Sequence, residues 1–188
     1  CLIRPLDVED SLCAEIDNPE DLEEVSARLK EVENRTVYMC FSADMLHSGH
    51  IAIIRKAARL GKLVIGVLSD EAVISYKRYP LLPYTERKAL FENIRGVSRV
   101  VEQKTLSYRE NLEKYKPDYV VHGDDWVTGF QKPVREEVLE ILKTYGGKLV
   151  EFPYSRDEKY KALENRARAD LSLPDVRRAR LRKAIAMK

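Results

Sequence analysis

Two histidines lie three positions apart in the segment 47–50, which reads HSGH, where an apolar run gives way to a helical pattern. The N-terminus of a helix offers backbone N–H groups and the positive end of the helix dipole, which together suit a phosphate group. Gly49 would let that phosphate approach the backbone closely. The imidazoles of His47 and His50 could donate to its non-bridging oxygens as charge builds in a pentavalent transition state. The segment therefore predicts chemistry at a phosphate.

The same two histidines have simpler interpretations. They could serve only as capping groups at the start of the helix. A metal site is disfavoured, because no third soft ligand lies near them in the sequence. The third histidine, His122, ends another apolar run, and we expect it to be a hydrogen-bonded core residue rather than a catalyst.

The elements that would position these residues alternate between strands and helices. Apolar runs predict five strands, at residues 36–41, 63–68, 97–101, 119–122 and 148–152. Helical spacing predicts the intervening helices, at residues 49–60, 70–77, 86–94, 108–115 and 132–145. Strands that are apolar on both faces and alternate with helices are typical of a parallel sheet covered on both sides. We therefore predict an α/β fold, a Rossmann-like doubly wound parallel five-stranded sheet with helices on both faces. Ligands of such sheets bind beyond the carboxyl ends of the strands, so the loops after Phe41, Leu68 and His122 are the expected sites.

The two ends of the chain differ from this pattern. Residues 1–34 are interpreted as an N-terminal helical appendage or the remnant of a preceding domain, with Asn18 as the cap of a helix that runs to about Glu33. Residues 173–188 are basic with helical spacing, and we favour a dimerising or docking helix over a nucleic-acid patch. The central domain is expected at 35–172. Since the chain opens with Cys1 rather than Met, we expect it to belong to a longer, multidomain polypeptide.

Bulk composition narrows the class of protein. The 188 residues suffice for one domain, and 33 basic against 31 acidic residues give a net charge of +2, with no global attraction to nucleic acid or membrane. The sequence contains no run long enough to span a membrane and no signal peptide. Three cysteines, Cys1, Cys13 and Cys40, fit neither a disulfide framework nor zinc spacing, so a reducing cytoplasm is the expected location.

Residues 41–50, which read FSADMLHSGH, resemble the signature of the cytidylyltransferase family, in which a strand leads through Asp and two hydrophobic residues into His-x-Gly-His. Further family motifs follow in order: SYKR at 75–78, YTERK at 84–88, ENIRGV at 92–97, with Ser98 where the family has Asp, and HGDDW at 122–126. The residues of these motifs are most similar to those of the nucleotidyltransferase domains fused to phosphoenolpyruvate mutase in phosphonate biosynthesis. The resemblance covers residues 37–154, about two-thirds of the chain.

The resemblance implies an enzyme that transfers CMP from CTP to a phosphonate or phosphomonoester, with Mg²⁺ and as a homodimer. It implies catalytic roles for His47, His50 and Lys77. It implies nucleotide-binding roles for Phe41, Ser42, Asp44, Gly49, Arg87, Arg95, Gly123, Asp124, Asp125, Trp126 and Ser155, with Asp44 also a candidate metal ligand. Several of these residues also have a purely structural interpretation. Lys77 could lie at a solvated helix end, and Arg95 could form a surface ion pair with Glu92 or Glu102. Asp124 and Asp125 could cap a turn, and Trp126 could be a core residue.

One segment departs from the family. Where the family carries a Gly followed by a Ser/Thr cluster for the β- and γ-phosphates, residues 154–161 read YSRDEKYK, with acids where pyrophosphate should lie. Arg156 or Lys159 could substitute as a point-charge clamp. A nucleotide-binding module without turnover is therefore the second hypothesis. The third, an adenylyltransferase or class I synthetase-like enzyme, is disfavoured by the Asp124-Asp125-Trp126 motif and by the lack of a Lys-Met-Ser-Lys-Ser-like loop.

Overall fold

A computed structural model describes residues 14–42, 45–76, 80–153, 160, 162–163 and 165–166. Within it, five parallel strands form one sheet in the order β3-β2-β1-β4-β5. Their bounds are β1 Thr36–Phe41, β2 Lys62–Leu68, β3 Val97–Gln103, β4 Tyr119–Gly123 and β5 Lys148–Phe152. The predicted doubly wound sheet is confirmed. Strand β3 runs two residues beyond its prediction, because Glu102 and Gln103 pair with the end of β2.

The order of the strands fixes where a ligand can bind. From β1 the chain moves outward through β2 to β3, then returns to the other side of β1 to form β4 and β5. Strands β1 and β4 are therefore neighbours whose connections leave in opposite directions. In open α/β sheets the crevice at such a reversal, beyond the carboxyl ends of the two strands, is where ligands bind. The segments after Phe41 and after Gly123 lie at this edge of the sheet.

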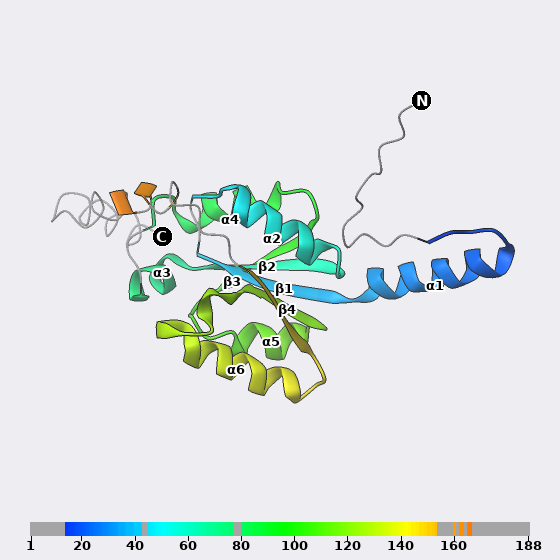
Figure 1. The fold of residues 1–188 in the computed structure, drawn as a ribbon. Helices are drawn as coiled ribbons and strands as arrows, with labels where there is room; N and C mark the ends of the chain where they lie inside the picture. Colours follow the sequence, from blue (N-terminus) through cyan, green and yellow to red (C-terminus); the bar gives the residue numbers. More distant parts are fainter. Residues whose placement is uncertain are drawn as a thin grey trace, which may run out of the picture.

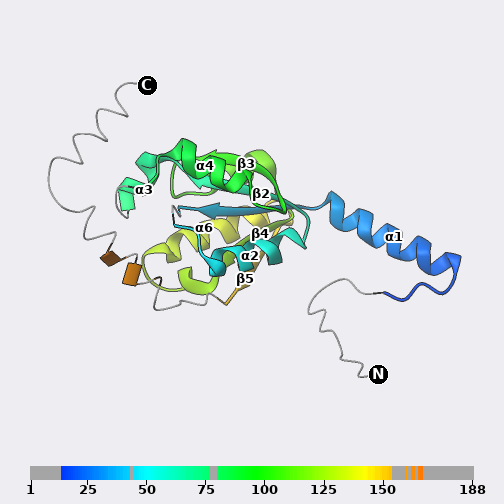
Figure 2. The same ribbon diagram turned by 90° about the horizontal axis from the view of Figure 1, so that it is seen from above.

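Helices cover both faces of the sheet (Figures 1 and 2). Helices α2 Ser48–Ala58 and α4 Tyr84–Glu92 lie on one face, and α5 Arg109–Tyr115 and α6 Lys132–Lys143 on the other. The short helix α3 Asp70–Tyr76 follows β2, and two 3₁₀ turns, η1 Asp124–Trp126 and η2 Gly129–Gln131, follow β4. Ile54, Leu63 and Phe91 lie in the core under α2 and α4, whereas Tyr38, Leu112 and Leu142 lie in the core over α5 and α6. The sheet residues thus contribute to both cores, as their apolar runs predict.

A buried polar network joins the centre of the sheet to α5. The Tyr38 hydroxyl donates to Gln103 Oε1 at 2.7 Å and accepts from Asn111 Nδ2 at 2.8 Å. Burial raises the pKa of Tyr38 well above its usual value, so the hydroxyl stays a donor. Gly66 on β2 leaves the room for that hydroxyl, because a Cβ there would overlap it. This network makes the position of β1, and hence of the loop that follows it, specific.

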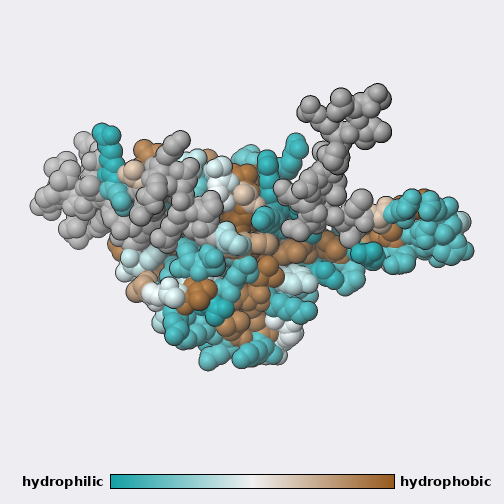
Figure 3. Space-filling model, in the orientation of Figure 1, coloured by the Kyte–Doolittle hydropathy of each residue, from teal (hydrophilic) through white to brown (hydrophobic). Residues whose placement is uncertain are grey.

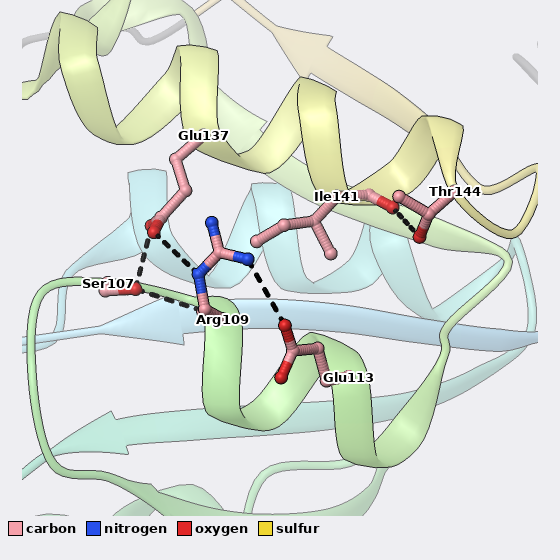
Figure 4. Close-up of polar contacts among 6 residues, drawn as sticks. All are labelled: Ser107, Arg109, Glu113, Glu137, Ile141 and Thr144. Atoms are coloured by element: carbon pink, nitrogen blue, oxygen red, sulfur yellow. Dashed lines mark hydrogen bonds and ion pairs between the residues drawn. The ribbon is translucent and has the colours of Figure 1, made fainter.

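Polar contacts also hold α5 against α6 (Figure 4). Glu137 of α6 accepts from the Ser107 hydroxyl at 2.8 Å and pairs with Arg109 Nε at 3.4 Å. Arg109 also reaches Glu113 one turn along its own helix, at 3.2 Å. Because these side chains are partly exposed, the cluster contributes orientation more than stability.

Helix α1, Pro19–Asn34, projects away from the sheet (Figures 1 and 2). Asn18 caps it in a reciprocal capping box with Asp21, as the sequence predicts for the cap residue. The helix buries none of its residues within the described chain, and hydrophilic side chains cover most of its visible surface in Figure 3. The predicted C-terminal helix at 173–188 lies outside the described residues. Among the helices that the structure describes, none combines the length and apolar character that a membrane crossing requires.

Candidate active site

The first histidine of the HSGH segment starts helix α2. His47 is the N-cap, in an extended conformation, and its Nδ1 accepts a hydrogen bond from the backbone N–H of Gly49 at 3.1 Å. A ring nitrogen that accepts a hydrogen bond carries no proton, so the proton of the neutral ring lies on Nε2. The capping alternative is therefore correct for His47. Gly49 contributes through its backbone.

The second histidine lies against the first. The ring centroids of His47 and His50 are 3.9 Å apart, with their planes inclined by 36°. Phe41 meets His50 edge to face at 5.7 Å and packs on Phe91 at 5.0 Å. Phe41 is buried, so it supports His50 from beneath and shows no surface to a ligand in this structure. Both histidines and the neighbouring Ser42 are partly exposed, so the pair rests on the core and faces outward.

A third ring completes this arrangement. Tyr160 stacks on His47, with centroids 4.3 Å apart and planes within 11°. Sequence reasoning missed this residue, although it is one of two tyrosines in the segment that replaces the Ser/Thr cluster. Its position in this segment could have indicated a site residue. The acidic and basic residues around it directed attention to charge instead of to the aromatic ring.

The motif after β4 has a different construction. The Trp126 side chain is 1% exposed, and its Nε1–H donates to Glu151 at 2.6 Å. Glu151 also accepts two hydrogen bonds from Arg135, both at 2.8 Å. His122 stacks on the indole at 3.8 Å. The core alternative therefore describes the Trp126 side chain, which anchors the turn, while Asp124 and Asp125 are exposed on that turn beside Gly123.

The charges in this turn are set by burial and by Arg135. Burial lowers the pKa of His122 below its usual value, against the opposing effects of the Gly123 carbonyl, which is 2.8 Å from His122 Nδ1, and of Asp125. The Arg135 hydrogen bonds lower the pKa of Glu151. A neutral imidazole and an ionised carboxylate thus flank the buried indole. His122 is hydrogen-bonded as predicted, but its side chain is 17% exposed, so it lies at the margin of the core rather than within it.

Arg87 is also buried, although it is a predicted nucleotide ligand. Its side chain is fully buried, pairs with Asp70 at 2.6 Å and donates from Nε to the Leu82 carbonyl at 3.1 Å. Nη1 has no hydrogen-bond partner among the described residues. The guanidinium therefore ties α4 to the start of α3, at the carboxyl end of β2. One donor remains for a further group.

Arg95 lies elsewhere. It is exposed in the turn between α4 and β3, just before the amino end of β3. In a parallel sheet this end is opposite the edge that carries His47 and His50. Within one chain the structure therefore does not bring Arg95 to the histidine pair. Three further predicted site residues, Asp44, Lys77 and Ser155, lie outside the described residues.

A metal centre built by the protein alone does not appear in the part of the chain that the structure describes, since it contains no group of three or more His, Cys, Asp or Glu side chains that could hold an ion. The arrangement offers instead two partly exposed imidazoles at a helix N-terminus, beside an exposed acidic turn. Such a site can bind a phosphate and neutralise charge that develops on it.

Comparison with known proteins agrees with this geometry. The model of the cytidylyltransferase-like family matches residues 39–178. The chain is 38% identical over 95 residues to an ethanolamine-phosphate cytidylyltransferase from Arabidopsis thaliana, a match that covers 47% of this chain and 23% of that protein. It is 32% identical over 122 residues to the glycerol-3-phosphate cytidylyltransferase of Staphylococcus aureus, covering 62% of this chain and 92% of that protein.

Among solved structures, a lipopolysaccharide core biosynthesis protein from Thermoplasma volcanium GSS1 has a similar fold, with a TM-score of 0.56 and 23% identity, over 65% of this chain and 98% of that one. This likeness supports the fold.

Proposed function

Because the chain belongs to the cytidylyltransferase-like family, we propose that it transfers CMP from CTP to a small phosphomonoester or phosphonate and releases pyrophosphate. The observation that carries the proposal is the histidine pair at the N-terminus of α2, at the edge where β1 and β4 diverge. Two relatives act, by their names, on ethanolamine phosphate and glycerol 3-phosphate, which are both phosphorylated alcohols. A phosphonate presents the same kind of attacking oxygen. The residues of the sequence motifs favour a phosphonate as the acceptor.

The reaction needs little proton transfer. An anionic oxygen of the acceptor attacks the α-phosphorus of CTP in line, a new P–O bond forms, and the bond to the β-phosphate oxygen breaks to release pyrophosphate. Since the nucleophile is already ionised, the protein contributes position and charge neutralisation. His47 would donate from Nε2–H, and His50 would neutralise charge on the same phosphate.

The nucleotide would extend from the histidine pair along the carboxyl edge of the sheet. We assign Asp124 and Asp125 to the ribose or base, since they are exposed on a turn that Trp126 anchors. Arg87 would support the phosphate site from within the fold, since its guanidinium, including Nη1, is buried near the end of β2. Lys77, Ser155 and Asp44 keep their predicted roles, and Mg²⁺ would enter with the triphosphate. Mg²⁺ sites use few protein carboxylates together with substrate phosphates.

The test is pyrophosphate release from CTP across a panel of phosphorylated alcohols and phosphonates, namely ethanolamine phosphate, phosphocholine, glycerol 3-phosphate, aminoethylphosphonate and hydroxyethylphosphonate. We expect release with CTP and one acceptor class, and none with His50→Ala. Release with ATP in place of CTP would support the adenylyltransferase hypothesis instead.

A nucleotide-binding module without turnover is the second candidate. It is favoured by the sequence of residues 154–161, which lacks the family's Ser/Thr cluster and carries acids where pyrophosphate should lie. CTP binding by calorimetry without pyrophosphate release from any acceptor would establish it. We further propose a cytoplasmic homodimer within a larger polypeptide. Light scattering on the purified chain tests the dimer.

A further inference from the structure

The three rings at the start of α2 form one stack. The His50 centroid lies 3.9 Å from that of His47 with the planes inclined by 36°, and the Tyr160 centroid lies 4.3 Å away with the planes within 11°. Centroids this close place both rings against the faces of the His47 imidazole rather than its edge. They cannot share one face, because rings lying side by side need a wider separation than these positions allow. Tyr160 and His50 therefore lie on opposite faces of the His47 imidazole.

This stack acts on the orientation of the His47 ring. The hydrogen bond from the Gly49 N–H holds Nδ1 at 3.1 Å, and a hydrogen bond to one ring atom does not by itself set the tilt of the ring plane. Rings on both faces restrict that tilt, and so fix the direction in which Nε2–H points. Terminal torsions of histidine are broad unless packing restricts them. A donor that must meet a developing charge gains from such preorganisation.

Resting on the proposed function, we infer that Tyr160 is a positioning residue that holds the His47 imidazole for the transfer step, through its ring rather than its hydroxyl. It does so from the segment 154–161, so this segment contributes to the site although it lacks the family's Ser/Thr cluster. The departure from the family then changes how the reaction centre is supported and does not by itself abolish turnover.

The experiment compares three variants of the full chain. Tyr160→Phe keeps the ring, Tyr160→Leu removes it, and Leu163→Ala, three residues further along the chain, changes an exposed side chain as the matched control. The first readout needs no substrate: the chemical shift and hydrogen exchange of the Gly49 amide, together with the ring-proton shifts of His47, by NMR. The second is the steady-state kcat and KM for CTP.

We expect Tyr160→Leu to accelerate exchange of the Gly49 amide and to lower kcat about tenfold, the scale of one aromatic stacking interaction, with a much smaller change in KM. Tyr160→Phe and Leu163→Ala should match the wild type in both readouts.

Three results would overturn the inference. Tyr160→Phe could lose as much as Tyr160→Leu, which would assign the role to the hydroxyl. Tyr160→Leu could leave the Gly49 amide unchanged, or could change the amide while kcat stays at the wild-type value. If the wild type releases no pyrophosphate with any acceptor, the proposed function fails on its own. The amide readout then decides alone whether Tyr160 holds His47, and an unchanged amide in Tyr160→Leu rejects the inference.

Discussion

Two histidine sites lie at the same edge of the sheet. In both, the imidazole stacks on another ring, but the surroundings of the two imidazoles differ. After β1, His47 stacks between Tyr160 and His50, and after β4, His122 stacks on Trp126 at 3.8 Å. The His47 site is partly exposed, and its ring caps helix α2 through Nδ1. The His122 site is closed by a buried indole tied to Glu151. Stacking alone therefore does not identify a reactive imidazole. The surroundings of the imidazole distinguish the two sites. The His47 ring is partly exposed and is the one that we propose for catalysis, whereas the His122 ring lies against a buried indole and anchors a turn.

The largest effect that separates the two sites should be on turnover. We expect His50→Ala to lower kcat about 10²–10³-fold, because one preorganised donor to the developing charge is lost. The free energy of unfolding should change by less than about 1 kcal/mol, since the imidazole is partly exposed. Pyrophosphate release and urea unfolding measure the two quantities. Unchanged turnover in a folded His50→Ala variant would remove the contrast and the proposed mechanism with it.

At the other site the corresponding loss should be in stability. Glu151→Ala leaves the buried Trp126 N–H without its acceptor and Arg135 without its partner, which should cost about 1–3 kcal/mol of unfolding free energy. Chemical denaturation measures this, with Glu140→Ala, an exposed residue of the same helix as Arg135, as control. Equal stability of the two variants would show that the carboxylate does not anchor the turn.

Acidification should weaken the β4 site in two steps. The folded pKa of His122 lies below its usual value of 6.5, so the unfolded chain binds its proton first and stability falls as the pH drops below about 6.5. The folded pKa of Glu151 also lies below its usual value of 4.5, so a second loss begins below about 4.5. Thermal unfolding across this pH range measures both. Stability that rises between pH 7 and 5 would contradict the burial of a neutral His122.

The smallest effect is expected from His122→Phe. The ring keeps its stacking on Trp126, so kcat should stay within about threefold and stability within about 1 kcal/mol of the wild type. The step in stability near pH 6.5 should disappear. A large loss of kcat in this variant would instead place His122 in the chemistry and make the two sites alike.

Much of this could be predicted from the sequence, because its signals are local. Runs that are apolar on both faces predicted the parallel sheet, and the helix start at His47 and His50 is where the sequence predicts it. The phosphate site at this helix start stays a prediction. The direction of a side chain is not local. Phe41 and Trp126 belong to motifs that resemble nucleotide-binding ones, yet both rings are buried in this fold.

Tertiary pairing explains the other differences. Arg87 is a charged residue on an amphipathic pattern, and its burial is compensated by Asp70, seventeen positions away, and by the Leu82 carbonyl. The position of Arg95 could have been derived, since a residue just before a strand lies at the amino edge of a parallel sheet. The resemblance to the family motif instead predicted a phosphate ligand at this position.

Helix α1 and the central strands should differ in the rate at which their backbone amides exchange. Its 16 residues are held by their own cap and turns, with no side chain buried in the described chain. An isolated helix of this length is marginal in water. Its amides should therefore exchange with deuterium through local fraying, whereas those of β1 and β2, which pair along their whole length in the core, should exchange only when the domain opens as a whole. A deuterium-labelling time course would then report the helix within its earliest points and the stability of the sheet in its latest.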